Sequence, residues 1–209
     1  MRRYRHASLL ALIPALALAG CAAVVGAGGL AAVSTLEDRR STGTQLDDSA
    51  IESRAGTRIG ERIGERGHIN VTAFNRSVLL TGEAWDEATR AEVEKVVSEV
   101  PNVRSVTNEV QAAGLSSATS RANDTAITAR VKGRFMNVQG LNPLHVKVVT
   151  EAGTVYLLGL VTEAEADKAT DLARSTSGVR KVVKVFEYCK STDDPCRPPP
   201  SEKPKSQRV

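Results

Sequence analysis

The residue whose surroundings point most directly to chemistry is Cys21, because of the segment that precedes it. The chain starts with a cluster of arginines and continues with an almost unbroken apolar run at 7–19. Small residues then lead up to the thiol in Leu18-Ala19-Gly20-Cys21. A basic start, a short apolar centre and a small-residue cleavage site are typical of a secretory signal, and the apolar run is too short to remain as a membrane span. We therefore expect residues 1–20 to be a signal peptide.

A cysteine directly after such a cleavage site is similar to the lipobox of bacterial lipoproteins. The resemblance implies that Cys21 carries a diacylglycerol on its sulfur and an acyl group on the amine exposed by cleavage. Three acyl chains hold a protein on a bilayer, since each buried CH₂ contributes about 0.8 kcal/mol. By the same resemblance, Ala22 sends the protein to the outer membrane, facing the periplasm. No cofactor beyond this covalent lipid is expected, and residues 21–46 are interpreted as a lipidated tether. A plain signal peptide with an incidental cysteine remains the alternative.

Two further cysteines, Cys189 and Cys196, follow the last strong hydrophobic pattern. An even pair in a secreted chain favours a disulfide, and the residues between them are prone to turn. Residues 189–209 are otherwise a polar, proline-rich tail. Neither these thiols nor His68 and His145 have the neighbouring ligands that a metal site needs. We predict no metal site and no catalytic residues, because the motifs of nucleophilic, phosphate-binding and zinc enzymes are missing.

The charge balance argues against nucleic-acid binding. The chain has 28 Lys and Arg against 24 Asp and Glu, but Arg2, Arg3 and Arg5 leave with the signal. The remaining chain then holds 25 basic and 24 acidic residues. A nucleic-acid-binding domain needs a basic surface on its folded part, so we expect no nucleic-acid partner.

The elements that must position these residues follow the order α-β-β-α-β over residues 47–113. A capping box of Ser49 and Glu52 is expected to start a helix whose apolar residues recur every fourth position. Two β-rich runs with a two-residue connection predict a hairpin. Asp86 can cap a second helix, and a third strand is expected at 103–110.

The first helix also carries glycines at every fourth position, Gly56, Gly60 and Gly64. Each interior glycine costs about 1 kcal/mol relative to alanine, so this helix is expected to be weak in isolation. The favoured interpretation is a shallow packing surface against the domain's own sheet. The alternative is close backbone approach to a partner.

The same order of elements returns over residues 123–188. A helix is expected from Asn123-Asp124-Thr125, and Thr162 with Glu165 makes a second capping box. Apolar strand residues recur 77 positions apart, in the pairs Val71 and Val148, Val78 and Val155, and Leu80 and Leu157. Internal duplication is the economical explanation, with residues 114–122 as the linker.

The repeated unit resembles the BON domain family. The resemblance is carried by residues 41–48, 69–73, 123–125, 149–153 and 159–163, and by the glycine after the second strand of each copy, Gly82 and Gly159. It implies an α+β fold of two repeated α-β-β-α-β domains, each a three-stranded mixed sheet packed on two helices. It also implies a non-enzymatic protein whose domains bind phospholipid and support outer-membrane integrity.

The charge is divided unevenly between the two copies. Residues 48–113 hold 8 basic and 11 acidic side chains, net −3, whereas residues 121–187 hold 10 and 7, net +3. Because an anionic bilayer attracts basic residues, the second copy is the better membrane contact. The expected partners are anionic phospholipids such as phosphatidylglycerol and cardiolipin. The rival hypothesis is a protein–protein adaptor that docks an outer-membrane assembly protein through the first copy.

The helix near Asp124 carries the candidate lipid contacts, in which basic residues border an apolar stripe. These candidates are Ile127, Arg130, Val131, Lys132, Arg134, Phe135 and Met136. The alternative is that the stripe is simply core, as it is in most amphipathic helices.

Overall fold

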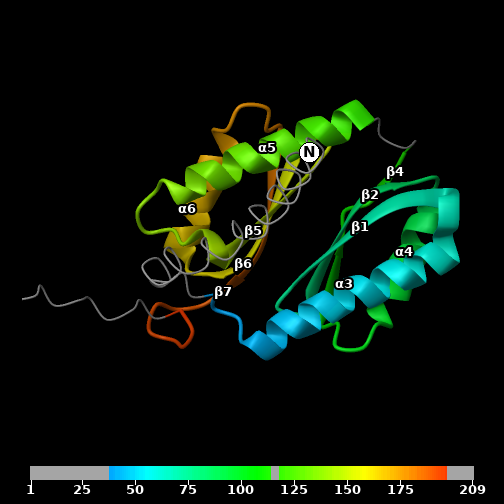
Figure 1. The fold of residues 1–209 in the computed structure, drawn as a ribbon, viewed down its shortest axis with the longest axis horizontal. Coiled ribbons are helices and arrows are strands. Elements are labelled where there is room, and N and C mark those ends of the chain that lie inside the picture. The colour runs from blue at the N-terminus through cyan, green and yellow to red at the C-terminus, as the bar shows by residue number, and fades with distance from the viewer. Residues whose placement is uncertain (1–37, 114–117, 197–209) are drawn as a thin grey trace, which may run out of the picture. The chain divides into compact units, whose positions relative to one another are not determined.

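The computed structural model describes residues 38–113 and 118–196. The predicted signal peptide, the predicted lipidation site Cys21 and the end of the tail lie outside the described residues. The first copy contains α3 (Thr42–Ile63), β1 (Gly67–Phe74), β2 (Ser77–Ala84), α4 (Glu87–Ser98), β3 (Ser105–Asn108) and β4 (Gln111–Ala112) (Figure 1). The second contains α5 (Ala118–Met136), β5 (Val146–Glu151), β6 (Thr154–Val161), α6 (Glu163–Arg174) and β7 (Lys181–Tyr188). Short 3-10 turns occupy Gly64–Arg66 and Pro143–His145.

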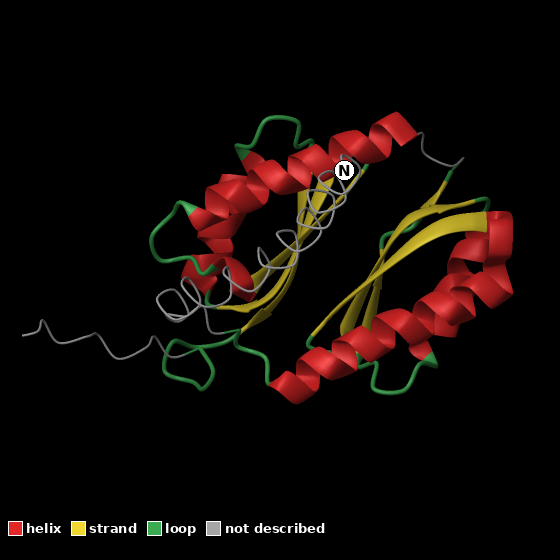
Figure 2. Ribbon diagram, in the orientation of Figure 1, coloured by secondary structure: helices red, strands yellow, loops and turns green. Residues whose placement is uncertain are grey.

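Each copy has the expected order of three strands in a mixed sheet, and the short β4 adds a fourth strand to the sheet of the first copy. The central strand, β2 or β6, pairs antiparallel with the strand before it and parallel with the strand after the second helix. Both helices of a copy lie on one face of its sheet (Figure 2). The predicted α+β fold of two repeated units is therefore confirmed. The strand expected at 103–110 is interrupted, because Val110 turns into the core with 1 % of its surface exposed, and β4 then pairs with β2 again.

Each copy encloses its own apolar core between its helices and its sheet. The four-residue period of α3 predicts its buried side correctly: Ile51, Ala55, Ile59 and Ile63 are all buried. In the second copy, the buried residues of α5 pack with those of β5, β6 and α6 in a separate cluster. The duplication seen in the sequence therefore produces two cores of similar construction.

In each copy, one buried aspartate of the first helix binds the turn of the neighbouring hairpin. Asp48 accepts hydrogen bonds from both backbone N–H groups of the turn at residues 75–76, at 2.8 and 2.7 Å. Asp124 does the same for the turn at 152–153, at 2.9 and 2.8 Å. All four turn residues have positive φ, the conformation that matches a two-residue hairpin turn to the twist of its strands. The aspartates thus hold both hairpins in place.

Both first helices begin earlier than the sequence predicts. The hydroxyl of Ser41 accepts a hydrogen bond from the N–H of Thr44 at 3.1 Å and caps α3. Ser49, the expected cap, lies inside the helix and donates its hydroxyl to a carbonyl one turn earlier. Likewise, α5 starts before Asn123. The expected helix starts are wrong because the adjacent aspartates bind hairpin turns instead of helix ends.

The glycines of α3 do not pack on the sheet. Gly56 and Gly60 are exposed, and a Cβ on either would meet nothing within 4 Å. Gly64 ends the helix with a φ of +54°. The favoured packing interpretation is therefore wrong, because the isoleucine and alanine side of α3 occupies the sheet-facing position.

The two copies contact each other through the sheet faces that their helices leave open. Phe74 and Leu79 of the first copy share one buried cluster with Tyr156 and Leu158 of the second. Alternate residues of the same strands face the helices, so each sheet is apolar on both faces. This pattern explains the nearly continuous apolar run of β6.

Polar side chains border the contact between the copies. Glu187 accepts a hydrogen bond from Asn75 Nδ2 at 2.9 Å and forms an ion pair with Arg104. Two further contacts are those of Lys147 with Glu52 at 2.7 Å and of Asn70 with Glu151 at 3.0 Å. These contacts select one register between the two sheet faces.

Candidate functional site

The helix predicted to contact lipid, α5, turns its apolar stripe inward. Ile127 and Val131 are 0 % exposed and Phe135 is 1 % exposed, inside the core of the second copy. These three residues are enclosed in the core while the domain is folded, so their burial does not agree with the prediction that they contact lipid. Their role is to hold α5 against the sheet and thereby to fix the positions of the neighbouring basic residues.

The other candidates lie outside this buried stripe. Arg130, Lys132 and Met136 are exposed, Met136 to 71 %. Arg130 and Arg134 both line a groove, whereas Lys132 and Met136 are not among its lining residues. The structure therefore brings the two predicted arginines together and leaves the lysine and the methionine apart from them.

The groove has a volume of about 640 Å³ and lies between α5 and the C-terminal end of α6. None of its lining residues is acidic. Its polar lining combines guanidinium, amide and hydroxyl groups, from Arg130, Arg134, Asn137, Ser175, Thr176 and Ser177. Such a lining offers several hydrogen-bond donors to an anion and no competing negative charge.

Arg134 is held in place by the end of α6. Its Nη1 donates hydrogen bonds to the carbonyl oxygen of Leu172 at 2.8 Å and to the hydroxyls of Ser175 at 2.9 Å and Thr176 at 3.1 Å. The last carbonyls of a helix lack intrahelical partners and attract a cation. Arg134 therefore caps the C-terminal end of α6 through Nη1. Its other N–H donors lie at the groove.

Arg130 lies one turn before Arg134 and is exposed. In the part of the chain that the structure describes, no hydrogen bond or ion pair engages its guanidinium. Its Nη2 lies close to Gly178, where an added Cβ would sit 3.1 Å away. One free and one fixed guanidinium suit an anionic oxygen group such as a phosphate, since arginine binds such groups through charge-assisted hydrogen bonds.

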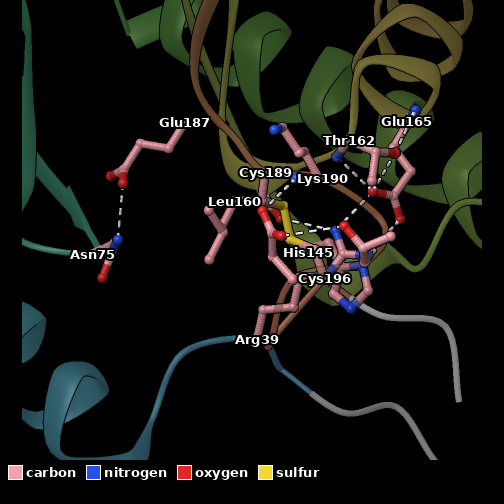
Figure 3. Close-up of a disulfide and its surroundings, with 12 residues drawn as sticks. Arg39, Asn75, His145, Leu160, Thr162, Glu165, Glu187, Cys189, Lys190 and Cys196 are labelled. Carbon is pink, nitrogen blue, oxygen red and sulfur yellow. Dashed lines mark hydrogen bonds and ion pairs between the residues drawn. A yellow bond between two sulfur atoms is a disulfide. The ribbon is translucent and has the colours of Figure 1, made fainter.

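The segment before α3 is bound to the second copy (Figure 3). Arg39 forms two hydrogen bonds with the carboxylate of Glu165, at 2.7 and 3.0 Å, and a third with the carbonyl oxygen of Leu160 at 2.9 Å. His145 approaches the same carboxylate at 3.3 Å. Burial of Glu165 opposes its ionisation, but the hydrogen bonds from His145, Arg39 and Thr162 outweigh burial and lower the pKa of this carboxyl.

A disulfide between Cys189 and Cys196 lies beside this network (Figure 3). The two Cα atoms are 6.1 Å apart, within the usual range for a disulfide. The N–H of Cys189 donates to the carbonyl oxygen of Val161 at 3.0 Å. The end of the tether and the beginning of the tail are therefore both fixed near the end of β6.

Residues 38–113 and 118–196 contain neither a candidate membrane-spanning helix nor a cluster of metal ligands. Within these ranges no helix is both long and apolar enough to cross a bilayer. The same ranges contain no group of three or more His, Cys, Asp or Glu side chains arranged to hold a metal ion. His68 and His145 lie in different copies, and His145 instead contacts Glu165.

Sequence reasoning missed Arg39 and the hydroxyl groups of the groove. Arg39 lies in a polar run interpreted as tether, and no local pattern distinguishes it from Arg40. The run Ser175-Thr176-Ser177 directly follows α6 and was the one available signal, because polar residues after a helix often bind its end. Its pairing with an arginine of α5 depends on how the two helices pack.

Comparisons with known proteins agree with this architecture. The BON domain family matches residues 47–114 and 123–190. Outer membrane lipoprotein DolP of Haemophilus influenzae is 34% identical over 173 residues, which cover 82% of this chain and 90% of that protein. The 21 kDa hemolysin of Actinobacillus pleuropneumoniae is 33% identical over 153 residues, 72% and 79% of the two chains. Osmotically-inducible protein Y of Escherichia coli is 31% identical over 144 residues, 67% and 72% of the two chains.

Proposed function

This chain belongs to the BON domain family, and from that premise we propose that it is a lipoprotein anchored in the outer membrane through Cys21. Its two domains face the periplasm, and the second binds anionic phospholipid and so supports the integrity of the membrane. Homology to an outer membrane lipoprotein supports the proposed location. The proposed role is binding and includes no catalysis.

The groove between α5 and α6 is the observation that carries the proposal. Arg130 offers a free guanidinium to a lipid phosphate, and Arg134 offers a second one that is already fixed. Hydroxyl and amide groups nearby can hydrogen-bond the glycerol headgroup of phosphatidylglycerol. Each basic residue near an anionic surface contributes about 1 kcal/mol, so this site alone binds weakly. Weak binding is sufficient, because the lipid on Cys21 already keeps the domain at high effective concentration near the bilayer.

Vesicle flotation of the mature chain carrying Cys21→Ser tests this function without the anchor. We expect the bound fraction to rise with the phosphatidylglycerol content of phosphatidylethanolamine vesicles. Arg130→Glu is expected to weaken binding about tenfold, because it replaces attraction by repulsion at the groove. Arg134 is left unchanged in this experiment because it caps α6.

Lys184→Glu is the matched control, since it makes the same charge change at an exposed position of β7 outside the groove. It is expected to weaken binding less than about threefold, because it changes only the screened long-range attraction between the protein's charge and the anionic vesicle. Binding that ignores phosphatidylglycerol, or that survives Arg130→Glu unchanged, contradicts the proposal. Either result would favour the adaptor role through the first domain.

A further inference from the structure

The first domain has a groove at the place that corresponds to the lipid groove of the second. Its volume is about 530 Å³. It is lined by four residues of α3 and one from the turn after α4, namely Ser53, Arg54, Thr57, Arg58 and Pro101. Neither the fold nor the proposed function uses the exposed arginine of this groove.

The arginine pairs of the two grooves occupy duplicated positions. Arg54 and Arg58 precede Arg130 and Arg134 by 76 positions, the same interval that separates the two aspartates that clamp the hairpins. Those aspartates bind the equivalent turn in each domain. The correspondence of the arginines is therefore structural as well as numerical.

The hydrogen bonding of the arginines is duplicated too. Arg58 Nη1 donates to the carbonyl oxygen of Glu99 at 2.9 Å, at the C-cap of α4, as Arg134 does at the end of α6. Arg54 is exposed, and among the described residues no hydrogen bond or ion pair engages its guanidinium, as is true of Arg130. Each groove thus presents one fixed and one free guanidinium, one helical turn apart.

We infer that the first BON domain carries a second anion-binding groove, which takes a phosphate group between Arg54 and Arg58. The chemistry is that of a phosphate mono- or diester, because two neighbouring guanidinium groups can share its oxygens. The inference rests on the same groove chemistry as the proposed function but concerns the other domain.

The surrounding charge makes the first groove the weaker of the two. Glu61 and Glu99 occupy the positions that Asn137 and Ser175 hold in the second domain, 76 residues later. Both carboxylates are exposed, so each repels an anion only modestly. The net charge of −3 on residues 48–113 acts in the same direction.

The two grooves belong to helix layers that face away from each other. In each domain the helices pack on one face of the sheet, and the opposite face forms the cluster shared with the other domain. A flat bilayer against α5 and α6 therefore leaves the groove of α3 uncovered. The phosphate group in that groove comes either from a soluble ester or from the headgroup of a second lipid surface.

The test is an NMR titration of the isotope-labelled mature chain carrying Cys21→Ser. The ligands are inorganic phosphate, glycerol 3-phosphate and a short-chain phosphatidylglycerol below its micelle concentration. We expect saturable shifts of the amides around Arg54 and Arg58, in addition to those at the second groove. Arg54→Gln should abolish the first set and spare the second, whereas Arg130→Gln should do the reverse. Arg54 caps no helix, so its replacement should leave the fold intact.

A gain-of-function variant gives an independent measurement. Glu61→Asn combined with Glu99→Ser installs the side chains of the second domain around the first groove. Removing two exposed carboxylates is expected to tighten phosphate binding there about fivefold. Unchanged affinity in this variant would contradict the inferred site.

The remaining outcomes separate the inference from the proposed function. Shifts at the second groove alone, or first-groove shifts that persist in Arg54→Gln, overturn the inference and leave the proposed function standing. Absence of shifts at both grooves with every ligand overturns both. Among supporting results, equal responses to glycerol 3-phosphate and to the lipid identify a soluble ester, whereas a response to the lipid alone identifies a headgroup.

Discussion

Single residues decide which part of the candidate site is structural and which is free to bind. Arg130 and Arg134 lie on the same side of α5, so their spacing predicts the same role for both. The acceptors that engage Arg134 come from residues 38 to 42 positions later in the chain. That contact depends on the packing of α6, which is why the sequence alone cannot separate a capping arginine from an exposed one.

Replacing Arg134 by alanine should therefore cost stability. We expect Arg134→Ala to lower the free energy of unfolding by about 1–2 kcal/mol, because the C-terminal carbonyl of Leu172 and two hydroxyls lose their charged donor. Arg130→Ala is the matched control. It should change the free energy of unfolding by less than about 0.5 kcal/mol, because Arg130 is exposed and no hydrogen bond or ion pair engages it among the described residues. Urea denaturation followed by circular dichroism measures both. Equal effects of the two variants would show that Arg134 caps nothing in solution.

Among the helices, the caps of the second helix of each copy were predicted correctly, whereas the starts of the first helices were not. Asp86 caps α4, and Thr162 with Glu165 forms the predicted capping box. Both are contacts within one turn of helix, so the sequence contains them. Asp48 and Asp124 have the same appearance as caps, yet each binds a hairpin nearly thirty residues away. An aspartate can either cap a helix or bind a hairpin turn, so its role can be assigned only once the position of the hairpin beside the helix is known.

The exposed glycines of α3 offer a test at the level of the helix. We expect Gly60→Ala to raise the free energy of unfolding by about 0.5–1 kcal/mol, because alanine restricts the unfolded chain and nothing occupies the space of its Cβ. Thermal denaturation of the purified protein measures the change.

Gly64→Ala is the control for that substitution. Its φ of +54° lies in a region that L-residues rarely adopt, so alanine there should destabilise the protein by about 1 kcal/mol or more. A destabilising Gly60→Ala would mean that this face of α3 is covered in solution. If Gly60→Ala stabilises the protein but impairs the envelope of cells that carry it, the adaptor role gains support.

In the molecule as a whole, the tether and the two domains are joined by buried contacts that the sequence did not predict. The sheet faces meet around Phe74, Leu79, Tyr156 and Leu158. Burial, with a smaller effect of nearby glutamates, raises the pKa of Tyr156 to about 12, so its hydroxyl remains protonated. Arg39 then fixes the end of the tether to the second domain, with 8 % of its side chain exposed. The domain proposed to bind lipid is therefore the one to which the anchor segment is attached.

The attachment through Glu165 should depend on pH. We expect Glu165→Gln to lower the free energy of unfolding by about 2 kcal/mol at neutral pH, because it removes the charge that pairs with Arg39 in a mostly buried network. The folded state lowers the pKa of Glu165, so this stability is complete above the unfolded pKa of about 4.3 and is lost as the pH falls below it. Urea titrations at a series of pH values should show the difference between wild type and variant shrinking in acid.

Arg39→Ala separates the tether from the helix cap, because the backbone N–H of Thr162 still donates to Glu165 in that variant. Arg39→Ala should lower the free energy of unfolding less than Glu165→Gln does, and this loss should also shrink in acid. It should also speed amide hydrogen exchange at the start of α3. A difference that stays constant from neutral to acid pH would contradict the role of Glu165. Glu151, whose pKa is raised by burial, cannot imitate the effect, because a raised carboxyl pKa favours the folded state as the pH falls. The sign of the slope therefore identifies which carboxylate controls the stability.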